Sequence, residues 1–545
     1  MMKKLLILTA ILTLVWSCGG KQQADLIVHN ATVYTVNDEF SVSTAFAIKD
    51  GKFVGVGTDE EVLANFESDQ IMNLDGAPVY PGLIDAHAHF YRYGLGLKNA
   101  DLVGTKSFDE ILEILQAHRE KYPDDEWIVG RGWDQNDWEN KEFPSKEKLD
   151  KLFPDVPVFL SRVDGHAALA NSSAMSQSEI FGNTKEVTGG KIYFDKNGDP
   201  TGLLVDNAMD LIGKYIPQQT RADQIEALIM AQENCFKVGL TSIVDAGLEV
   251  DTIELIDSLN KAGKLKMRLY TMVAPSEESI EYFKKRGKIK TDYLNVRSFK
   301  VYGDGALGSR GANLLSDYSD DPGNSGFLLE TEANYDELAK TIYDMGFQMN
   351  THCIGDRTDR VILDIYAKYL PEGNDLRWKI EHAQVVSNED VPKFGKYNVV
   401  PSVQPTHATS DMYWAAERLG EERVKTAYAF KDLLDQNGYI ALGSDFPVED
   451  INPLYGYHAA VARQDSENWP EGGWQPENKL SREEALKGMT IWAAYSNFEE
   501  NEKGSIEVGK FADFIITEKD MMKAPESELR NLKVKATYLN GNKVY

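Results

Sequence analysis

The central part of the chain alternates short apolar stretches with longer amphipathic segments, and this alternation restricts the fold more than any other feature. Eight apolar stretches are predicted strands: residues 79–84, 241–244, 267–273, 296–302, 348–351, 378–380, 399–403 and 440–443. Six amphipathic segments between them are predicted helices: residues 250–262, 280–288, 335–345, 357–370, 388–397 and 423–436. Strands that alternate with helices form parallel βαβ units, and eight such units close into a barrel. The pattern predicts an α/β fold, a TIM-like (β/α)8 barrel.

The first two predicted strands are too far apart in sequence for a single helical crossover. A structureless connection of that length is uncommon in a compact domain. We therefore predict an insertion after the first barrel strand, at about residues 100–235, with its own strands near 127–129 and 158–161 and a hairpin near 191–204.

Both ends of the chain consist of short alternating strands separated by turn signals. Asp50-Gly51 and Asn540-Gly541 are typical hairpin turns. Because the two ends of a domain commonly lie close together, residues 25–78 and 505–545 are predicted to form one small β-sandwich domain. The barrel then occupies residues 79–504.

The first residues resemble a bacterial lipoprotein signal. Lys3 and Lys4 precede an apolar run that is too short to span a bilayer, and the run ends at Ser17-Cys18. We predict a signal peptide at 1–17, a lipidated Cys18 and a tether at 18–24. The body would then lie in the bacterial cell envelope, on the periplasmic or the outer side, and contact the membrane only through this anchor. The alternative is a cleaved secretory signal with an incidental cysteine.

The net charge indicates which partners the chain can bind, and the cysteine count indicates whether disulfide bonds hold it together. The formal net charge of −28 repels phosphate backbones, so we expect no nucleic acid partner. Cys235 and Cys353 are too few for a disulfide framework and are interpreted as buried thiols, although one bond between them stays open. The sequence also leaves open whether the chain forms a homo-oligomer.

Histidines gather at the carboxyl ends of the predicted barrel strands, where barrel enzymes carry their active sites. His87 and His89 follow the first strand two positions apart, so their side chains can converge on one cation. His352 and His382 end the fifth and sixth strands, and Asp445 follows the eighth. Four imidazoles and one carboxylate are therefore expected around a metal site.

This arrangement resembles the amidohydrolase superfamily. Five segments carry the resemblance: residues 79–89, 299–312 (F-K-V-Y-G-D-G-A-L-G-S-R-G-A), 350–356 (N-T-H-C-I-G-D), 380–384 (I-E-H-A-Q) and 442–447 (L-G-S-D-F-P). They are similar to the amidohydrolase 3 branch, which includes N-substituted formamide deformylase-like proteins. The resemblance covers nearly the whole mature chain and implies a metal-dependent hydrolase.

The resemblance also implies how the metal ligands are shared. His87 and His89 would hold the more buried ion, and His352 and His382 the second. Lys300 occupies the position where relatives carry a carboxylated lysine that bridges two ions. A carbamate is anionic, whereas an ammonium beside two cations would be repelled. We expect two divalent ions, with zinc favoured, although these ligands also accept manganese, iron or cobalt.

An alternative to this ligand set stays open. A plain Lys300 paired with Asp304 would leave one bound metal ion.

Several residues are candidates for catalysis. Asp445, beside a metal-bound water, is suited to take its proton and deliver it to the leaving nitrogen. His407 and His166 are candidates to polarise the substrate carbonyl or to bind substrate polar groups. A structural role for either histidine is equally compatible with the sequence.

Three residues are candidates for binding substrate. Glycines around Asp304 bring this stretch of backbone close to substrate or metal, Arg310 is a candidate anchor for a substrate carboxylate, and Trp133 is a candidate roof of the pocket. An internal salt bridge of Arg310 and a buried tryptophan are the alternatives for the last two.

These observations predict an amidohydrolase that acts on a non-peptide carbon–nitrogen bond of a small amide, formamide or cyclic amide. A metal-bridging hydroxide would attack the carbonyl carbon, and Asp445 would move the proton. A mononuclear deaminase or C–O hydrolase on the same scaffold is the second hypothesis. The third, from another class, is an envelope lipoprotein that only binds its ligand.

Overall fold

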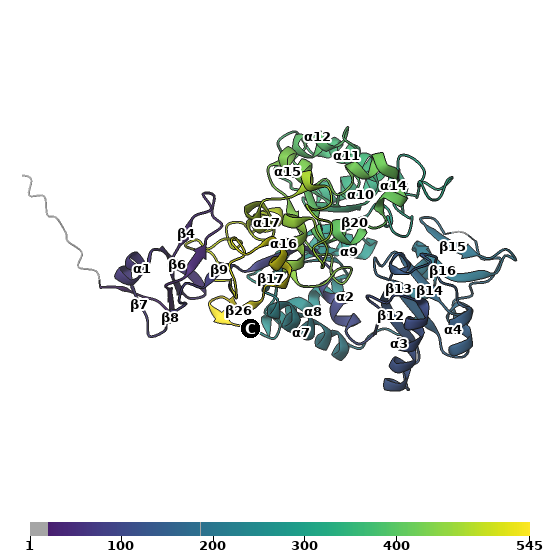
Figure 1. The fold of residues 1–545 in the computed structure, drawn as a ribbon, viewed down its shortest axis with the longest axis horizontal. Helices are drawn as coiled ribbons and strands as arrows, with labels where there is room; N and C mark the ends of the chain where they lie inside the picture. Colours follow the sequence, from purple (N-terminus) through teal and green to yellow (C-terminus); the bar gives the residue numbers. More distant parts are fainter. Residues whose placement is uncertain (1–19, 186) are drawn as a thin grey trace, which may run out of the picture.

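The computed structural model describes residues 20–185 and 187–545, so the predicted signal peptide and Cys18 lie outside the described residues. A parallel sheet occupies the centre of the molecule (Figure 1). Its strands follow the order of the chain: β10 (Leu83–Ala88), β17 (Leu240–Leu248), β18 (Arg268–Val273), β20 (Leu294–Tyr302), β21 (Gln348–Cys353), β22 (Lys379–His382), β23 (Val400–Val403) and β24 (Ala441–Leu442). Because β24 returns to contact β10, the sheet forms the predicted (β/α)8 barrel.

Helices pack around this barrel because each of them has one apolar face. In α11 (Asp356–Tyr369), for example, Ile362, Leu363 and Tyr366 are buried at helical spacing. The other helices between strands are α2 (Phe90–Gly96), α7 (Arg221–Lys237), α8 (Val250–Lys261), α9 (Glu277–Arg286), α10 (Glu332–Asp344), α12 (Val391–Lys396) and α15 (Phe430–Asn437). Further helices after strands β23 and β24 are α13 (Pro405–Asp411), α14 (Ala415–Arg423), α16 (Pro453–Ala462), α17 (Arg482–Gly488) and α18 (Ile491–Ser496).

The first predicted strand, 79–84, is wrong as one element, because it joins two strands from different sheets. Strand β9 (Pro78–Pro81) belongs to the β-sandwich, and the barrel strand β10 begins at Leu83. At Gly82 between them, a Cβ would lie 2.3 Å from the Thr241 hydroxyl oxygen, so only glycine fits where the chain passes from one sheet to the other. The sandwich therefore extends to Pro81.

The two ends of the chain form a β-sandwich at one end of the molecule (Figure 1). One sheet has the order β6-β5-β2-β8 and the other the order β27-β26-β25-β9-β3-β4. Phe514 lies between the sheets, stacked on Tyr538 at 4.3 Å and edge-on to Phe46 at 5.1 Å. The strands are β2 (Leu26–His29), β3 (Thr32–Tyr34), β4 (Val42–Ser43), β5 (Ala45–Lys49), β6 (Lys52–Gly57), β8 (Ile71–Asn73), β25 (Phe514–Thr517), β26 (Val534–Leu539) and β27 (Asn542–Lys543).

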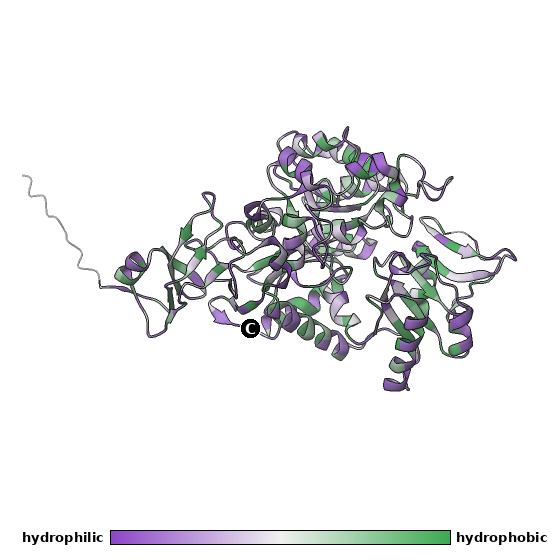
Figure 2. Ribbon diagram, viewed as in Figure 1, coloured by the Kyte–Doolittle hydropathy of each residue, from purple (hydrophilic) through white to green (hydrophobic). Residues whose placement is uncertain are grey.

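The insertion is a separate layer with its own sheet and core, on the opposite side of the barrel from the sandwich (Figure 1). Its strands are β11 (Ala100–Asp101), β12 (Ile128–Trp133), β13 (Val158–Arg162), β14 (Ala167–Ala170), β15 (Gly190–Phe194) and β16 (Pro200–Asp206). Helices α3 (Phe108–Lys121), α4 (Glu147–Leu152), α5 (Ser172–Gln177) and α6 (Asp210–Gly213) accompany them. Figure 2 shows apolar colouring on these strands and polar colouring on loops and helix ends.

The insertion ends earlier than residue 235. Helix α7 belongs to the barrel, because it packs against α2 so closely that a Cβ on Gly94 would lie 2.3 Å from the Ala227 carbonyl oxygen. Cys235 on α7 and Cys353 on β21 are both buried and free, which agrees with their interpretation as buried thiols. Within the described residues, no helix is long and apolar enough to cross a membrane.

Candidate metal centre

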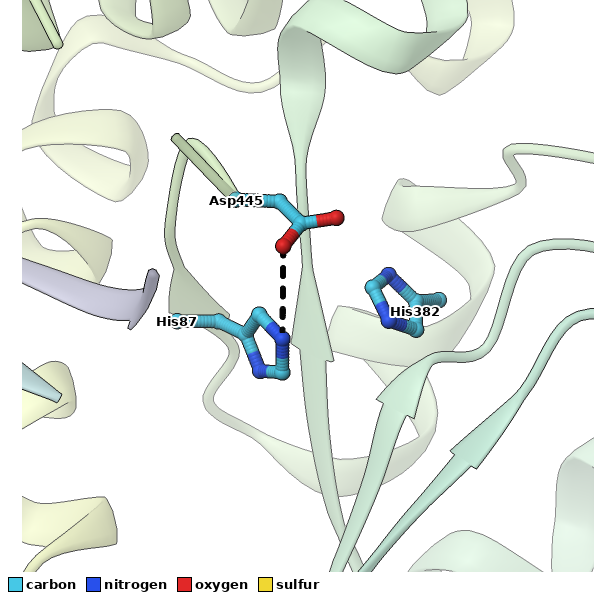
Figure 3. A group of neighbouring side chains, drawn as sticks. All are labelled: His87, His382 and Asp445. Atoms are coloured by element: carbon cyan, nitrogen blue, oxygen red, sulfur yellow. Dashed lines mark ion pairs between the residues drawn. The ribbon is translucent and has the colours of Figure 1, made fainter. Parts of the chain in front are cut away.

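Three side chains converge at the carboxyl end of the barrel. His87 on β10, His382 at the end of β22 and Asp445 after β24 each offer one ligand atom, and these atoms lie within 4.8 Å of one another. All three residues are buried. Figure 3 shows the carboxylate of Asp445 directed at the ring of His87, with the ring of His382 beside them. Two imidazoles and a carboxylate at this spacing are suited to a divalent cation.

The turn after β24 positions Asp445. Its backbone N–H donates to the His87 carbonyl at 2.7 Å, and the Ser444 hydroxyl donates to Asp85 at 2.6 Å. A Cβ on Gly443 would lie 2.5 Å from the backbone nitrogen of His87, so this close approach of the two chain segments requires glycine. Asp445 and His382 both have positive φ angles, +61° and +75°. Residues other than glycine rarely adopt this left-handed conformation, and those that do are common at functional sites.

Two buried acceptors orient the histidine ligands. The Nδ1 of His87 lies 2.6 Å from Glu381 Oε2, and the Nδ1 of His382 lies 2.7 Å from Gln404 Oε1. A histidine that donates through Nδ1 presents the lone pair of Nε2 to a metal. Glu381 and Gln404 are candidate orienting residues that the sequence analysis missed. The sequence signal for them was their position, since Glu381 directly precedes His382 and Gln404 directly follows the predicted strand 399–403.

Electrostatics around Glu381 and Asp445 keep both side chains anionic. Burial would raise the pKa of Glu381, but the charge and the hydrogen bond of His87 lower it to about 2. Burial likewise opposes ionisation of Asp445, but the nearby imidazoles of His89, His87 and His382 hold its pKa well below the usual range. Asp445 Oδ1 is buried and has no hydrogen-bond partner.

His89 adds a third imidazole beside this carboxylate. Its Nε2 lies 3.3 Å from Asp445 Oδ1, and its Nδ1 lies 3.2 Å from the Ala246 carbonyl. Burial lowers the pKa of His89 to about 3 and that of His382 well below its ordinary value. Neutral imidazoles and an unpartnered carboxylate oxygen are the donor set that a divalent cation needs, so the residues present fit a metal ion.

Lys300 and His352 lie beside this group but outside its most compact part. Lys300 on β20 places Nζ 3.2 Å from His87 Nε2. His352 on β21 directs Nε2 at the Gly305 carbonyl, at 3.4 Å, and lies 3.7 Å from Asp304 Oδ1. The compact group in the described chain accounts for one cation, and the second ion stays a prediction.

The two histidines predicted to act on substrate line the same cavity as the metal centre. His407 Nε2 is buried without a hydrogen-bond partner, 3.9 Å from Asp445 Oδ2. His166 reaches the site from the insertion, with its Nδ1 2.6 Å from Asp206 Oδ1. Burial disfavours its charged form, but the hydrogen bond and charge of Asp206 raise the pKa of His166 to about 9. The structure thus brings both residues to the metal centre, while their catalytic roles stay predictions.

The three predicted substrate-binding residues do not reach this cavity. The Asp304 carboxylate accepts hydrogen bonds from the backbone N–H groups of Asn313, Ile354 and Gly355 at 2.9–3.0 Å, so it holds two loops together. Arg310 pairs with Asp320 at 2.9 Å, the internal salt bridge that was its alternative. Trp133 is buried in the core of the insertion and donates to the Leu160 carbonyl at 2.7 Å. These contacts assign all three side chains to structural roles.

Comparisons with known proteins agree with this geometry. A model of the family described as "Amidohydrolase family" matches residues 70–545. The putative amidohydrolase YtcJ of Bacillus subtilis is 32% identical over 526 residues, which cover 95% of this chain and 99% of that protein. N-substituted formamide deformylase of Arthrobacter pascens is 26% identical over 543 residues, with coverage of 95% and 98%. An uncharacterized metal-dependent hydrolase from Pyrococcus horikoshii superposes with a TM-score of 0.74 at 27% identity, covering 92% of this chain and 99% of the other.

Proposed function

This chain belongs to the amidohydrolase family, and from that premise we propose that it hydrolyses the carbon–nitrogen bond of a small non-peptide amide, formamide or cyclic amide. The family and the hydrolase names of its relatives make it a metal-dependent hydrolase of carbon–nitrogen bonds. The observation that supports the finer proposal is the buried group of His87, His382 and Asp445, whose ligand atoms share one small volume. A formamide or amide is favoured because a relative that matches nearly the whole chain is a formamide deformylase.

In this proposal, His87, His89, His382 and Asp445 would hold one divalent cation, with zinc favoured by imidazole and carboxylate ligands. When bound, such a cation acidifies water and polarises a carbonyl oxygen. Glu381 and Gln404 keep the imidazole rings in the orientation that binding needs, because they fix Nδ1 as the hydrogen-bond donor.

Asp445 is the proposed proton carrier. Its Oδ2 lies on the side of His407, 3.9 Å from Nε2, and faces the cavity that would contain the substrate. An anionic carboxylate at this position can accept a proton from the attacking water and return it to the leaving nitrogen. The low pKa of Asp445 makes its conjugate acid a ready proton donor.

His166 and His407 are the proposed binders of the substrate carbonyl oxygen. A protonated His166, held by Asp206, presents its other ring N–H to the cavity. Donors already fixed around the position where negative charge develops lower the barrier, because they need no reorganisation during the reaction.

Carboxylation of Lys300 is a further part of this proposal. As an ammonium, Nζ would compete for the Nε2 lone pair of His87 at 3.2 Å, whereas a carbamate would add an anionic ligand. Two metal ions per chain, and reconstitution that depends on bicarbonate, are then expected in elemental analysis. One ion per chain with no effect of bicarbonate would remove the carbamate from the proposal.

The experiment that tests the function is a substrate screen of the metal-loaded protein. We expect amine release from N-substituted formamides or amides, lost after treatment with a chelator and restored by zinc. Ammonia release from amino-heterocycles alone, or activity confined to esters, would favour the deaminase or C–O hydrolase hypothesis instead. Ligand binding without any turnover would favour a binding protein.

The envelope location is proposed separately and rests on residues 3–18 of the sequence. A lipidated Cys18 would keep the precursor in the membrane fraction of a bacterial host, and Cys18→Ala would release it. If Cys18→Ala stays in the membrane fraction, or if the wild-type protein is found soluble with a free thiol at position 18, the anchor is wrong.

A further inference from the structure

A second and larger cavity adjoins the metal centre. It has a volume of about 880 Å³, against about 260 Å³ for the cavity that contains His382 and His407. His89, His166 and Tyr302 line both, so the two spaces meet beside the candidate metal ligand His89. A substrate bound for attack at the metal centre can therefore extend part of its structure into the second cavity.

Two arginines without an acidic partner line this second cavity. Arg92 projects from α2 and Arg131 from β12 of the insertion. Across the described chain, neither guanidinium has a carboxylate oxygen within 4.0 Å, whereas the buried Arg162 and Arg268 are both paired with aspartates. Arg131 donates from Nη2 to the Val163 carbonyl at 2.7 Å, but its Nε is buried and has no partner.

Tyr302 completes a group of donors between the arginines and the metal centre. A Cβ built on Gly247 would lie 3.5 Å from the Tyr302 hydroxyl, 3.9 Å from an Arg92 nitrogen and 3.8 Å from Lys300 Cγ, so these three side chains surround one point. Among the described residues, the buried Tyr302 hydroxyl has no hydrogen-bond partner. Burial opposes ionisation of this tyrosine, but the charge of Arg92 lowers its pKa.

Within the described chain, the acidic residues of the same cavity form no close ion pair with the arginines, although the charges of Asp245 and Asp445 act on Arg92. Asp164 is engaged by Arg162 and by the backbone N–H of His166, and Asp206 is engaged by the His166 ring. The remaining carboxylates, Asp210, Glu277 and Glu330, are exposed to solvent, where water screens their charge. Burial and the neighbouring charge of Arg92 lower the pKa of Arg131, although Asp445 and Asp164 act in the opposite direction.

We propose that Arg92 and Arg131 bind a carboxylate of the substrate in the second cavity, with Tyr302 as an additional donor. This inference rests on the proposed function and makes the substrate an amide that also carries a carboxylate a few bonds from the scissile bond. The planar guanidinium fork matches the two oxygens of a carboxylate, and among the described residues the buried Arg131 Nε and Tyr302 hydroxyl would gain a partner on binding. The proposed binding site for the substrate carboxylate is therefore the second cavity and not Arg310, because the Arg310 guanidinium already donates to Asp320.

The test compares matched substrates that differ only in charge. N-formylglycine and N-formylphenylalanine are each compared with their uncharged carboxamides, on the zinc-loaded protein. Charge-assisted hydrogen bonds predict that kcat/KM for the acids exceeds that for the carboxamides by about 10- to 100-fold. Arg92→Met should bring this ratio close to one, and Arg92→Lys should retain part of it because the charge remains without the fork. Arg286→Met, at an exposed arginine of α9 that forms no ion pair within the described residues, is the matched control and should leave the ratio unchanged.

Thermal unfolding and zinc content establish that each variant is folded and loaded. If Arg92→Met does not fold, Arg131→Met provides the same comparison. A wild-type ratio near one, or a ratio that neither arginine variant changes, overturns the carboxylate site while the proposed function stands.

Failure of the function itself is distinguished by calorimetry with succinate on the same zinc-loaded protein. If no amide is hydrolysed, but succinate binds and Arg92→Met weakens its binding at least tenfold, the anion site is supported and the proposed reaction is contradicted. Succinate that does not bind, or that binds both proteins equally, overturns the anion site.

Discussion

The barrel mouth and the β-sandwich both bury many side chains, but they differ in whether the buried polar atoms have hydrogen-bond partners. In the described chain, every buried side-chain nitrogen or oxygen without a hydrogen-bond partner lies outside the two sandwich segments, 25–81 and 505–545. Several of these atoms surround the metal centre, on Glu381, His407, Asp445 and Tyr302. The sandwich core is built from apolar and aromatic side chains such as Phe46, Phe514 and Tyr538.

This difference separates binding from stability. An unpartnered buried polar group costs about 1–3 kcal/mol, so a cluster of them destabilises the barrel mouth unless a ligand supplies the missing partners. The sandwich has no such cost and holds the chain ends against the barrel by apolar burial. We expect substitutions in the mouth to change chemistry and binding, and substitutions in the sandwich to change stability. The predictions below test that separation, from the largest effect to the smallest.

Asp445→Asn is expected to have the largest effect on catalysis. Loss of a proton carrier lowers kcat by about 10²–10⁴-fold, and an asparagine also weakens the metal site. The metal-free variant should remain folded, because the apolar core of the barrel is unchanged. Steady-state kinetics and thermal melts measure the two quantities. A variant that keeps more than a tenth of the wild-type kcat would exclude Asp445 as the proton carrier.

Phe514→Ala is expected to lower stability and to leave catalysis unchanged. Removal of a fully buried ring that contacts Phe46 and Tyr538 lowers the free energy of unfolding by about 3–5 kcal/mol, while the folded fraction keeps its kcat/KM. Urea unfolding followed by circular dichroism gives the first value and kinetics the second. A loss of kcat/KM in fully folded protein would show that the sandwich shapes the active site.

Glu381→Gln is expected to act on metal affinity. The amide can still contact His87 Nδ1, but loss of the negative charge should weaken zinc binding by about 10–100-fold. Competition with a chromophoric chelator measures the affinity. The control is Glu499→Gln, a buried glutamate paired with Lys290 and Lys503, which should reduce stability and leave zinc affinity unchanged. Equal zinc affinity of the Glu381 variant and the wild type would contradict the orienting role.

Arg310→Ala should have the smallest effect. It removes one partner of Asp320, which keeps its contact with Arg418, and a pair with this exposure contributes about 1 kcal/mol or less. The KM for any carboxylate-bearing substrate should stay within about twofold of the wild-type value. The substitution removes only one exposed ion pair, which lies away from the site. A large increase in KM would return Arg310 to the substrate site.

The fold and the ligand set were predictable to different extents, for reasons visible at particular residues. An apolar run identifies a strand such as β18, because a parallel strand that is buried on both faces is mostly apolar. It does not separate β9 from β10, since both are apolar and the change of sheet at Gly82 depends on contact with Thr241. The group of candidate ligands His87, His382 and Asp445 was predictable from the places of these residues at strand ends.

The sequence alone determined the barrel and the histidines and aspartate at its mouth, because local periodicity and strand order decide which residues reach the carboxyl edge. Only the tertiary structure decided what supports and surrounds them. Glu381 meets His87 across 294 positions of sequence, and Arg131 comes to the cavity from an inserted sheet. Such contacts have no local signal, because they depend on how separate layers pack. The same packing gives Arg310, Asp304 and Trp133 their structural partners and removes them from the site.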